Sequence, residues 1–119
     1  MNYASSLTKA NVKRFEEARS LLRKTMPMAR CVLGGSDDLT LRMRLVYARA
    51  LFMNAAATLE DLREAVTTLE DTVRIRRRVF GGANPLTVGV ERSLRAARAA
   101  LVRNARAVLG ARETPSAHG

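Results

Sequence analysis

The stretch FGGANPLTV, residues 80–88, gives the clearest evidence for the fold. Paired glycines followed by Asn-Pro are typical of either a phosphate-binding loop or a turn between helices. A phosphate-binding loop needs a preceding strand and a Lys-Ser or Lys-Thr pair close behind it, and this stretch has neither. In a turn, a glycine supplies the positive φ that ends one helix, Asn84 caps the next helix, and Pro85 takes its first position. The sequence therefore predicts a turn that joins two helices.

A second copy of this stretch, LGGSDDLTL, lies at residues 33–41. At the same offset of 47 residues, FEEARSLL (15–22) lies over LREAVTTL (62–69). A fixed period of this size is typical of stacked helical repeats. Asp37 stands in the place of Asn84, so we expect it to cap the helix that follows the first turn.

Apolar residues at spacings of three and four predict four helices, over about residues 8–33, 38–53, 58–80 and 85–109. The second is apolar on two faces and should lie between neighbours. A variant capping box, Thr58-Leu-Glu-Asp, starts the third. The side chains expected to face inward are Phe15, Ala18, Leu22, Met26, Ala29 and Leu33; Leu39, Met43, Tyr47, Ala50 and Leu51, with Leu41, Leu45, Ala48 and Phe52 on the other face; Leu62, Ala65, Val66, Leu69, Val73 and Phe80; and Val90, Leu94, Ala97, Leu101, Ala105 and Val108.

The composition agrees with a single all-α domain. The chain has 119 residues, of which 47% are hydrophobic and only 4% aromatic, a balance that favours helix packing over a sheet. We expect a helical domain over residues 8–110, a flexible N-terminus over 1–7 and a disordered tail over 111–119.

The charge is strongly basic, with 21 Lys and Arg against 11 Asp and Glu. This balance favours acidic partners, which include acidic peptides, nucleic acid and anionic membranes, although Arg also suits a solvated helix face. The lone cysteine, Cys31, excludes an internal disulfide and is expected to be buried as a small apolar residue. No apolar run approaches the roughly 18 residues of a membrane span and no secretory signal is present, so we expect an intracellular protein, cytoplasmic or nuclear, without a membrane.

The helix length, the Gly-Gly turns and the Glu-Ala-x-x-x-Leu core resemble the tetratricopeptide repeat (TPR) in its kinesin-light-chain form. That form has a Leu-Gly helix end, an acidic-Pro turn, a Thr-Leu opening and a Leu-Ala pair. The resemblance covers about residues 12–109, and only the last pair of the second unit departs from the pattern. The matching pairs are Leu33-Gly34, Asp37-Asp38, Thr40-Leu41 and Tyr47-Ala48 in the first unit, and Phe80-Gly81, Asn84-Pro85, Thr87-Val88 and Leu94-Arg95 in the second.

The resemblance implies antiparallel helical hairpins stacked as a short right-handed solenoid. In the register of the family, the chain is a B helix, a complete A–B hairpin and then an A helix. The first helix has no polar cover, so we expect either self-association or a fragment of a larger TPR protein with no separate activity.

The resemblance also implies a protein-interaction scaffold that binds a peptide along the groove of its A helices. The asparagines that family members place there are absent from the corresponding positions. The remaining arginines and aliphatic residues would complement an acidic segment with apolar anchors. The groove residues are Arg42, Leu45, Val46, Arg49, Met53, Arg92, Ser93 and Ala96.

Two clusters of arginine allow an alternative function in nucleic-acid binding. Residues 74–78, RIRRR, fan around their helix with Arg76 opposite the others, and Glu70 stands four residues before Arg74, which favours a solvated face. The last helix is basic along one side but has no aromatic residue for base stacking. Its basic face comprises Arg95, Arg98, Arg103 and Arg106.

The sequence contains no pattern of catalytic residues. The only histidine, His118, lies in the predicted tail, and the adjacent Asp37 and Asp38 are explained as a helix cap. Catalysis needs His, Cys or carboxylate groups that converge on a pocket, and none is indicated. We therefore expect no enzyme activity, no cofactor and no metal.

Overall fold

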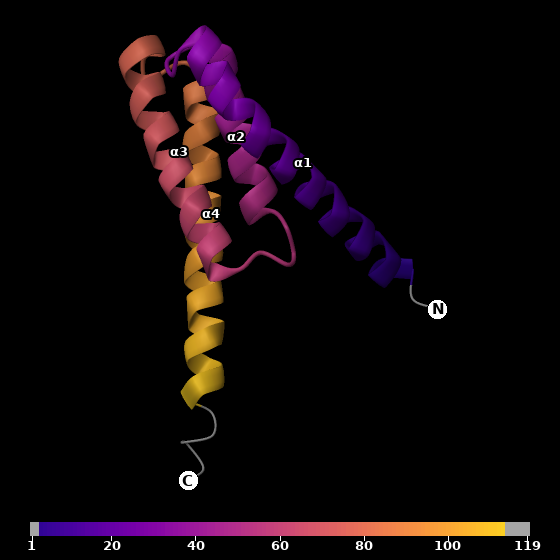
Figure 1. Ribbon diagram of the computed structural model, residues 1–119. Coiled ribbons are helices and arrows are strands. Elements are labelled where there is room, and N and C mark those ends of the chain that lie inside the picture. Colours follow the sequence, from indigo (N-terminus) through magenta and orange to yellow (C-terminus); the bar gives the residue numbers. More distant parts are fainter. Residues whose placement is uncertain (1–2, 114–119) are drawn as a thin grey trace.

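The computed structural model describes the backbone of residues 3–113 and the side chains of residues 9–110. The described chain forms four helices and no strand: α1 (Tyr3–Leu33), α2 (Asp38–Phe52), α3 (Leu59–Phe80) and α4 (Pro85–Glu113). Successive helices run antiparallel, and each packs against the next one along the chain (Figure 1). The α2 helix contacts α1, α3 and α4, which confirms the prediction that it lies between neighbours. The all-α class is therefore confirmed.

The two outer helices are longer than predicted. The α1 helix begins at Tyr3, inside the segment expected to be flexible, and α4 continues to Glu113, inside the expected tail. The residues before Glu113 are mostly strong helix formers, and the next helix breaker is Pro115. The rest of the expected tail, residues 114–119, lies outside the described residues.

The first glycine of each pair ends a helix in the same way. Gly34 has a φ of 91° and Gly81 a φ of 86°, and both are in the region that favours glycine. The Gly34 N–H donates to the carbonyl of Arg30 at 3.0 Å, and the Gly81 N–H donates to that of Arg77 at 3.1 Å. The predicted turns are confirmed.

The helix that follows each glycine turn is capped as predicted. The Asp37 side chain accepts a hydrogen bond from the Leu39 N–H at 2.9 Å, and the Asn84 side chain accepts one from the Leu86 N–H at the same distance. The capping box at the start of α3 is also present, with Thr58 as its first residue. These bonds satisfy N–H groups that have no partner within the helix.

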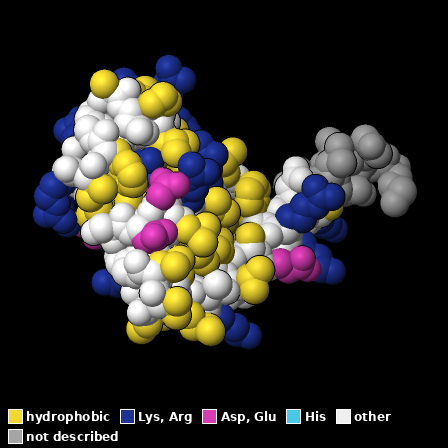
Figure 2. Space-filling model, turned by 90° about the horizontal axis from the view of Figure 1, so that it is seen from above, with side chains coloured by type: hydrophobic (Ala, Val, Ile, Leu, Met, Phe, Trp, Pro, Cys, Tyr) yellow, Lys and Arg dark blue, Asp and Glu magenta, His cyan; other side chains and the backbone are white. Residues whose placement is uncertain are grey.

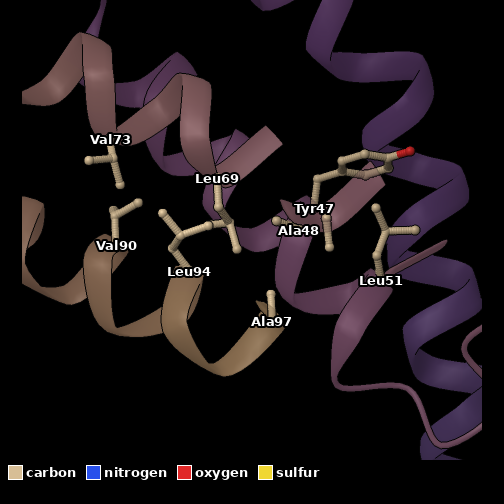
Figure 3. Close-up of a cluster of buried hydrophobic side chains, with 9 residues drawn as sticks. Tyr47, Ala48, Leu51, Leu69, Val73, Val90, Leu94 and Ala97 are labelled. Atoms are coloured by element: carbon tan, nitrogen blue, oxygen red, sulfur yellow. The ribbon is translucent and has the colours of Figure 1, made fainter. Parts of the chain in front are cut away.

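The core lies between α2, α3 and α4, and α1 covers one edge of it with Leu22 and Met26 (Figures 1 and 3). The N-terminal half of α1 extends away from the other helices, and so do the last turns of α4 (Figure 1). Within the described residues, no helix is long and apolar enough to cross a membrane. The buried cluster comprises Tyr47, Ala48, Leu51, Ala65, Leu69, Val73, Val90, Leu94 and Ala97.

Some side chains predicted to face inward are exposed. Leu33 and Phe80 stand at the last turn before each glycine, and Leu39 stands at the first turn after it, where the neighbouring helices no longer cover them. Val108 lies on the part of α4 beyond the bundle. Cys31, expected to be buried, is also exposed in the last turn of α1.

Arg76 is the largest fully buried side chain, with 2% of its surface exposed. Its guanidinium lies 4.6 Å from the ring centre of Phe80 and donates a hydrogen bond to Asp38 at 2.9 Å. This bond, with a further ion pair from Arg42 at 2.7 Å, holds the pKa of Asp38 below its ordinary value. Arg76 therefore joins α3 to the start of α2.

Candidate functional site

The residues of the predicted groove lie on α2 and α4, which contact each other. The Arg49 Nε donates to the Ser93 Oγ at 3.3 Å, so the two helices meet at this point. Ser93 is buried, whereas Val46 and Met53 are more than half exposed. The structure thus brings Arg49 and Ser93 of the predicted groove together. Except for Ser93 and the half-buried Leu45, the predicted groove residues are exposed: Arg42, Val46, Arg49, Met53, Arg92 and Ala96.

The predicted basic face of α4 divides into two parts. Arg95 and Arg98 line an open groove between α3 and α4. Arg103 lies farther along the helix, beside the connection between α2 and α3, and Arg106 is exposed beyond it. The arginines of α4 therefore do not share one binding surface.

The groove between α3 and α4 has a volume of about 770 Å³. Two ion pairs cross it, from Arg98 to Glu70 at 2.9 Å and from Arg77 to Glu91 at 2.8 Å. Its apolar lining consists of Val73 and Leu94, which keep 7% and 8% of their surfaces exposed. The groove is lined by Glu70, Val73, Arg74, Arg77, Arg78, Glu91, Leu94, Arg95 and Arg98.

The charge of the groove is positive, because five arginines stand against two glutamates and both glutamates are paired. Arg74 is paired with Asp71 at 2.6 Å. Arg78 and Arg95 are exposed, one on each helix, and neither has an ion pair or hydrogen bond from its side chain to the described residues. Two guanidinium groups are thus available to a ligand.

The interpretation of residues 74–78 as a solvated face missed this groove. Glu70 stands four residues before Arg74 on the same helix, but it pairs with Arg98 on α4. A signal for this arrangement exists in the sequence. In an antiparallel hairpin that turns at residues 81–84, Glu70 and Arg98 lie at similar distances from the turn, as do Arg77 and Glu91.

A smaller groove lies between α1 and α2, and α3 closes it. Its volume is about 300 Å³. Glu64 of α3 accepts hydrogen bonds there from the Tyr47 hydroxyl and from Arg23 at 3.1 Å, while the Arg23 Nε donates to the Tyr47 hydroxyl at 2.9 Å. Burial and the bond to Glu64 raise the pKa of Tyr47. This network joins α1, α2 and α3.

Comparison with protein families, curated proteins and solved structures gives no match. Within the described residues, no three His, Cys, Asp or Glu side chains are grouped so that they could hold a metal ion. The described chain therefore offers two candidate binding surfaces, the face of α2 and α4 and the groove between α3 and α4.

Proposed function

We propose that the chain is a non-enzymatic protein-interaction module of TPR-like hairpins, which binds an acidic segment of a partner protein. The observation that carries this proposal is the groove between α3 and α4. It combines an apolar floor, formed by Val73 and Leu94, with arginines on both walls.

The chemistry of the groove favours an acidic polypeptide with apolar anchors. Arginine binds carboxylates through paired N–H groups, and Arg78 and Arg95 are free to do so. Apolar anchors from the partner would cover Val73 and Leu94. Charge complementarity of this kind gives specificity and a fast association rate.

The face of α2 and α4 offers a second surface of the same character. Arg49 and Arg92 are exposed on these two helices, and so are the side chains of Val46 and Met53. Figure 2 shows that apolar side chains also lie among Lys and Arg at the end of the molecule that carries the glycine turns, with few Asp or Glu. Self-association through α1, whose Leu21, Met28 and Val32 are exposed, stays a prediction.

Nucleic-acid binding is the alternative function. It draws on the same arginines, but single-stranded nucleic acid is usually held by aromatic side chains on which bases stack. The groove between α3 and α4 has no aromatic residue in its lining. The composition of the groove therefore favours a protein partner.

Fluorescence anisotropy with three labelled probes tests the proposal. The probes are an acidic peptide with leucines between its glutamates, a polyglutamate peptide of equal charge, and a single-stranded oligouridine RNA. We expect the leucine-containing peptide to bind most tightly and to keep most of its affinity as salt is raised. Tighter binding of the RNA, with an affinity that falls steeply with salt, would favour the alternative function.

A further inference from the structure

The smaller groove, between α1, α2 and α3, holds more positive charge than its own residues compensate. Three arginines and one glutamate line it. Both carboxylate oxygens of that glutamate, Glu64, are already occupied, because one accepts from Arg23 at 3.1 Å and the other from the Tyr47 hydroxyl. Arg23 and Glu64 therefore neutralise each other, and the charges of Arg30 and Arg44 are left over.

Arg44 of α2 is the more buried of these two arginines, with 17% of its side chain exposed. Its ion-pair partner Asp71 lies 3.6 Å away, which is longer than an N–H···O hydrogen bond. The same carboxylate also pairs with Arg74 at 2.6 Å, so one negative charge serves two arginines. A largely buried charge with little compensation is unfavourable, and an anion that reaches Arg44 would relieve this cost.

Arg30 of α1 brings a second cation to the same groove. Its side chain is exposed and has no ion pair or hydrogen bond to the described residues. Burial lowers the pKa of Arg44; the charge of Asp71 raises this pKa, and the charges of Arg30 and Arg74 lower it further. Arg30 and Arg44 therefore lie close enough to repel each other, and a ligand with two negative charges would attract both.

The rest of the lining suits a small molecule. The groove has a volume of about 300 Å³, which is the lower end of the range of small-molecule sites. Thr68 of α3 contributes a hydroxyl that makes no hydrogen bond to the described residues and can donate to a ligand oxygen. Met26 and Pro27 add apolar surface beside the charged groups.

We infer that the smaller groove binds a phosphate group, free or carried by a small molecule, between Arg30 and Arg44. The N–H groups of arginine match phosphate oxygens in pairs. A phosphate monoester carries a charge of about −1.5 to −2 at neutral pH, which balances two arginines better than a single carboxylate does. The bound group would also hold α1 on α2, because each helix supplies one arginine. This site lies apart from the groove between α3 and α4 and does not depend on the proposed function.

NMR of the methionine methyl groups tests the site. The full chain, labelled at these methyl groups, is titrated with inorganic phosphate, phenyl phosphate or acetate at constant ionic strength. We expect the Met26 signal to shift with a saturable one-site curve for both phosphates, and the signal of Met53, which lies outside the groove, to stay unchanged. Acetate should bind roughly tenfold more weakly or worse, because its single charge cannot balance both arginines.

Variants of the protein locate the bound anion. Arg30→Gln changes an exposed side chain, so the fold should be retained, and Arg44→Gln removes the more buried cation. We expect each change to weaken phosphate binding roughly tenfold or more, because hydrogen bonds to a charged group are lost. Two controls should change the affinity less than about threefold: Arg106→Gln, outside both grooves, and Arg78→Gln with Arg95→Gln, in the groove between α3 and α4.

Saturable binding that Arg30→Gln and Arg44→Gln weaken and the controls retain would support the site. If circular dichroism shows that Arg44→Gln is unfolded, Arg30→Gln alone decides. Under this result, tighter binding of phenyl phosphate than of inorganic phosphate would support a small-molecule ester as the ligand, and equal affinity would support phosphate itself.

Three other results would overturn the site or its ligand. Shifts that rise linearly with concentration, or that both groove variants leave unchanged, would show only screening of a basic surface. Weakening by Arg78→Gln with Arg95→Gln instead would place the anion in the other groove. Acetate binding as tight as that of phosphate would overturn the assignment of a phosphate group.

Discussion

Gly34 and Gly81 lie 47 residues apart and end α1 and α3 with nearly the same backbone angle, a φ of 91° and of 86°. Their N–H groups donate to the carbonyl oxygens of Arg30 and Arg77 at closely similar distances. The repeat seen in the sequence is thus a repeat of local structure.

Replacement of Gly81 with Ala should destabilise the protein by about 1–2 kcal/mol, because a side chain strains a backbone with positive φ. Gly82 is the matched control, since it does not have a positive φ and a Cβ added there meets no atom within 4 Å. Urea unfolding of the two variants gives the comparison. Equal losses for Gly81→Ala and Gly82→Ala would contradict the turn described here.

Replacement of Thr87 with Val should stabilise the protein by about 1 kcal/mol, because a buried hydroxyl without a partner is removed. Thr87 is 0% exposed and its Oγ1 has no hydrogen-bond partner; Thr40, in the equivalent position, has the same surroundings. Thermal unfolding of Thr87→Val and Thr40→Val should show an increase in both midpoints. A decrease in both would mean that the hydroxyls form bonds that the structure does not contain.

Replacement of Asp38 with Asn should cost at most about 1 kcal/mol, because buried Arg76 would lose the charge of its partner, while the partial exposure of Asp38 limits the loss. Arg76→Met should lower the free energy of unfolding less than Asp38→Asn does. The double variant should recover at least half of the stability lost in Asp38→Asn, since an apolar side chain of similar length can replace the buried cation. A double-mutant cycle in urea measures the coupling. Additive losses would show that the two side chains do not interact.

The stability of the protein should fall in strong acid partly through Asp38. Its pKa in the folded chain is lowered from the ordinary value of 3.8, first by the hydrogen bond from Arg76. The stabilisation is therefore present above pH 3.8 and is lost as the pH falls through the lower pKa of the folded state. Because Asp38 is partly exposed, we expect an effect below about 1 kcal/mol, seen as a shallower acid dependence in Asp38→Asn than in the wild type.

Local rules were sufficient to predict the turns and caps. Gly81, Asn84 and Thr58 act within a few residues of their own position, so their roles follow from the sequence nearby. The helix period also predicted the core, with Leu69 and Leu94 as examples.

The groove between α3 and α4 depends on which residues of separate helices meet, and local rules do not determine this. Glu70 has an arginine four residues ahead on its own helix, yet it pairs with Arg98 across the groove. Arg76 was placed opposite its neighbouring arginines from the sequence, but its burial required knowledge of Asp38 and Phe80.

Methyl chemical-shift mapping locates the binding site of an acidic peptide on the protein. The protein, labelled at its Val and Leu methyl groups, is titrated with the unlabelled acidic peptide that has leucines between its glutamates. We expect the largest shifts at Val73 and Leu94, in the groove between α3 and α4, and small shifts at Val46 on the face of α2 and α4. Large shifts at Val46 with unchanged signals from Val73 and Leu94 would contradict this expectation.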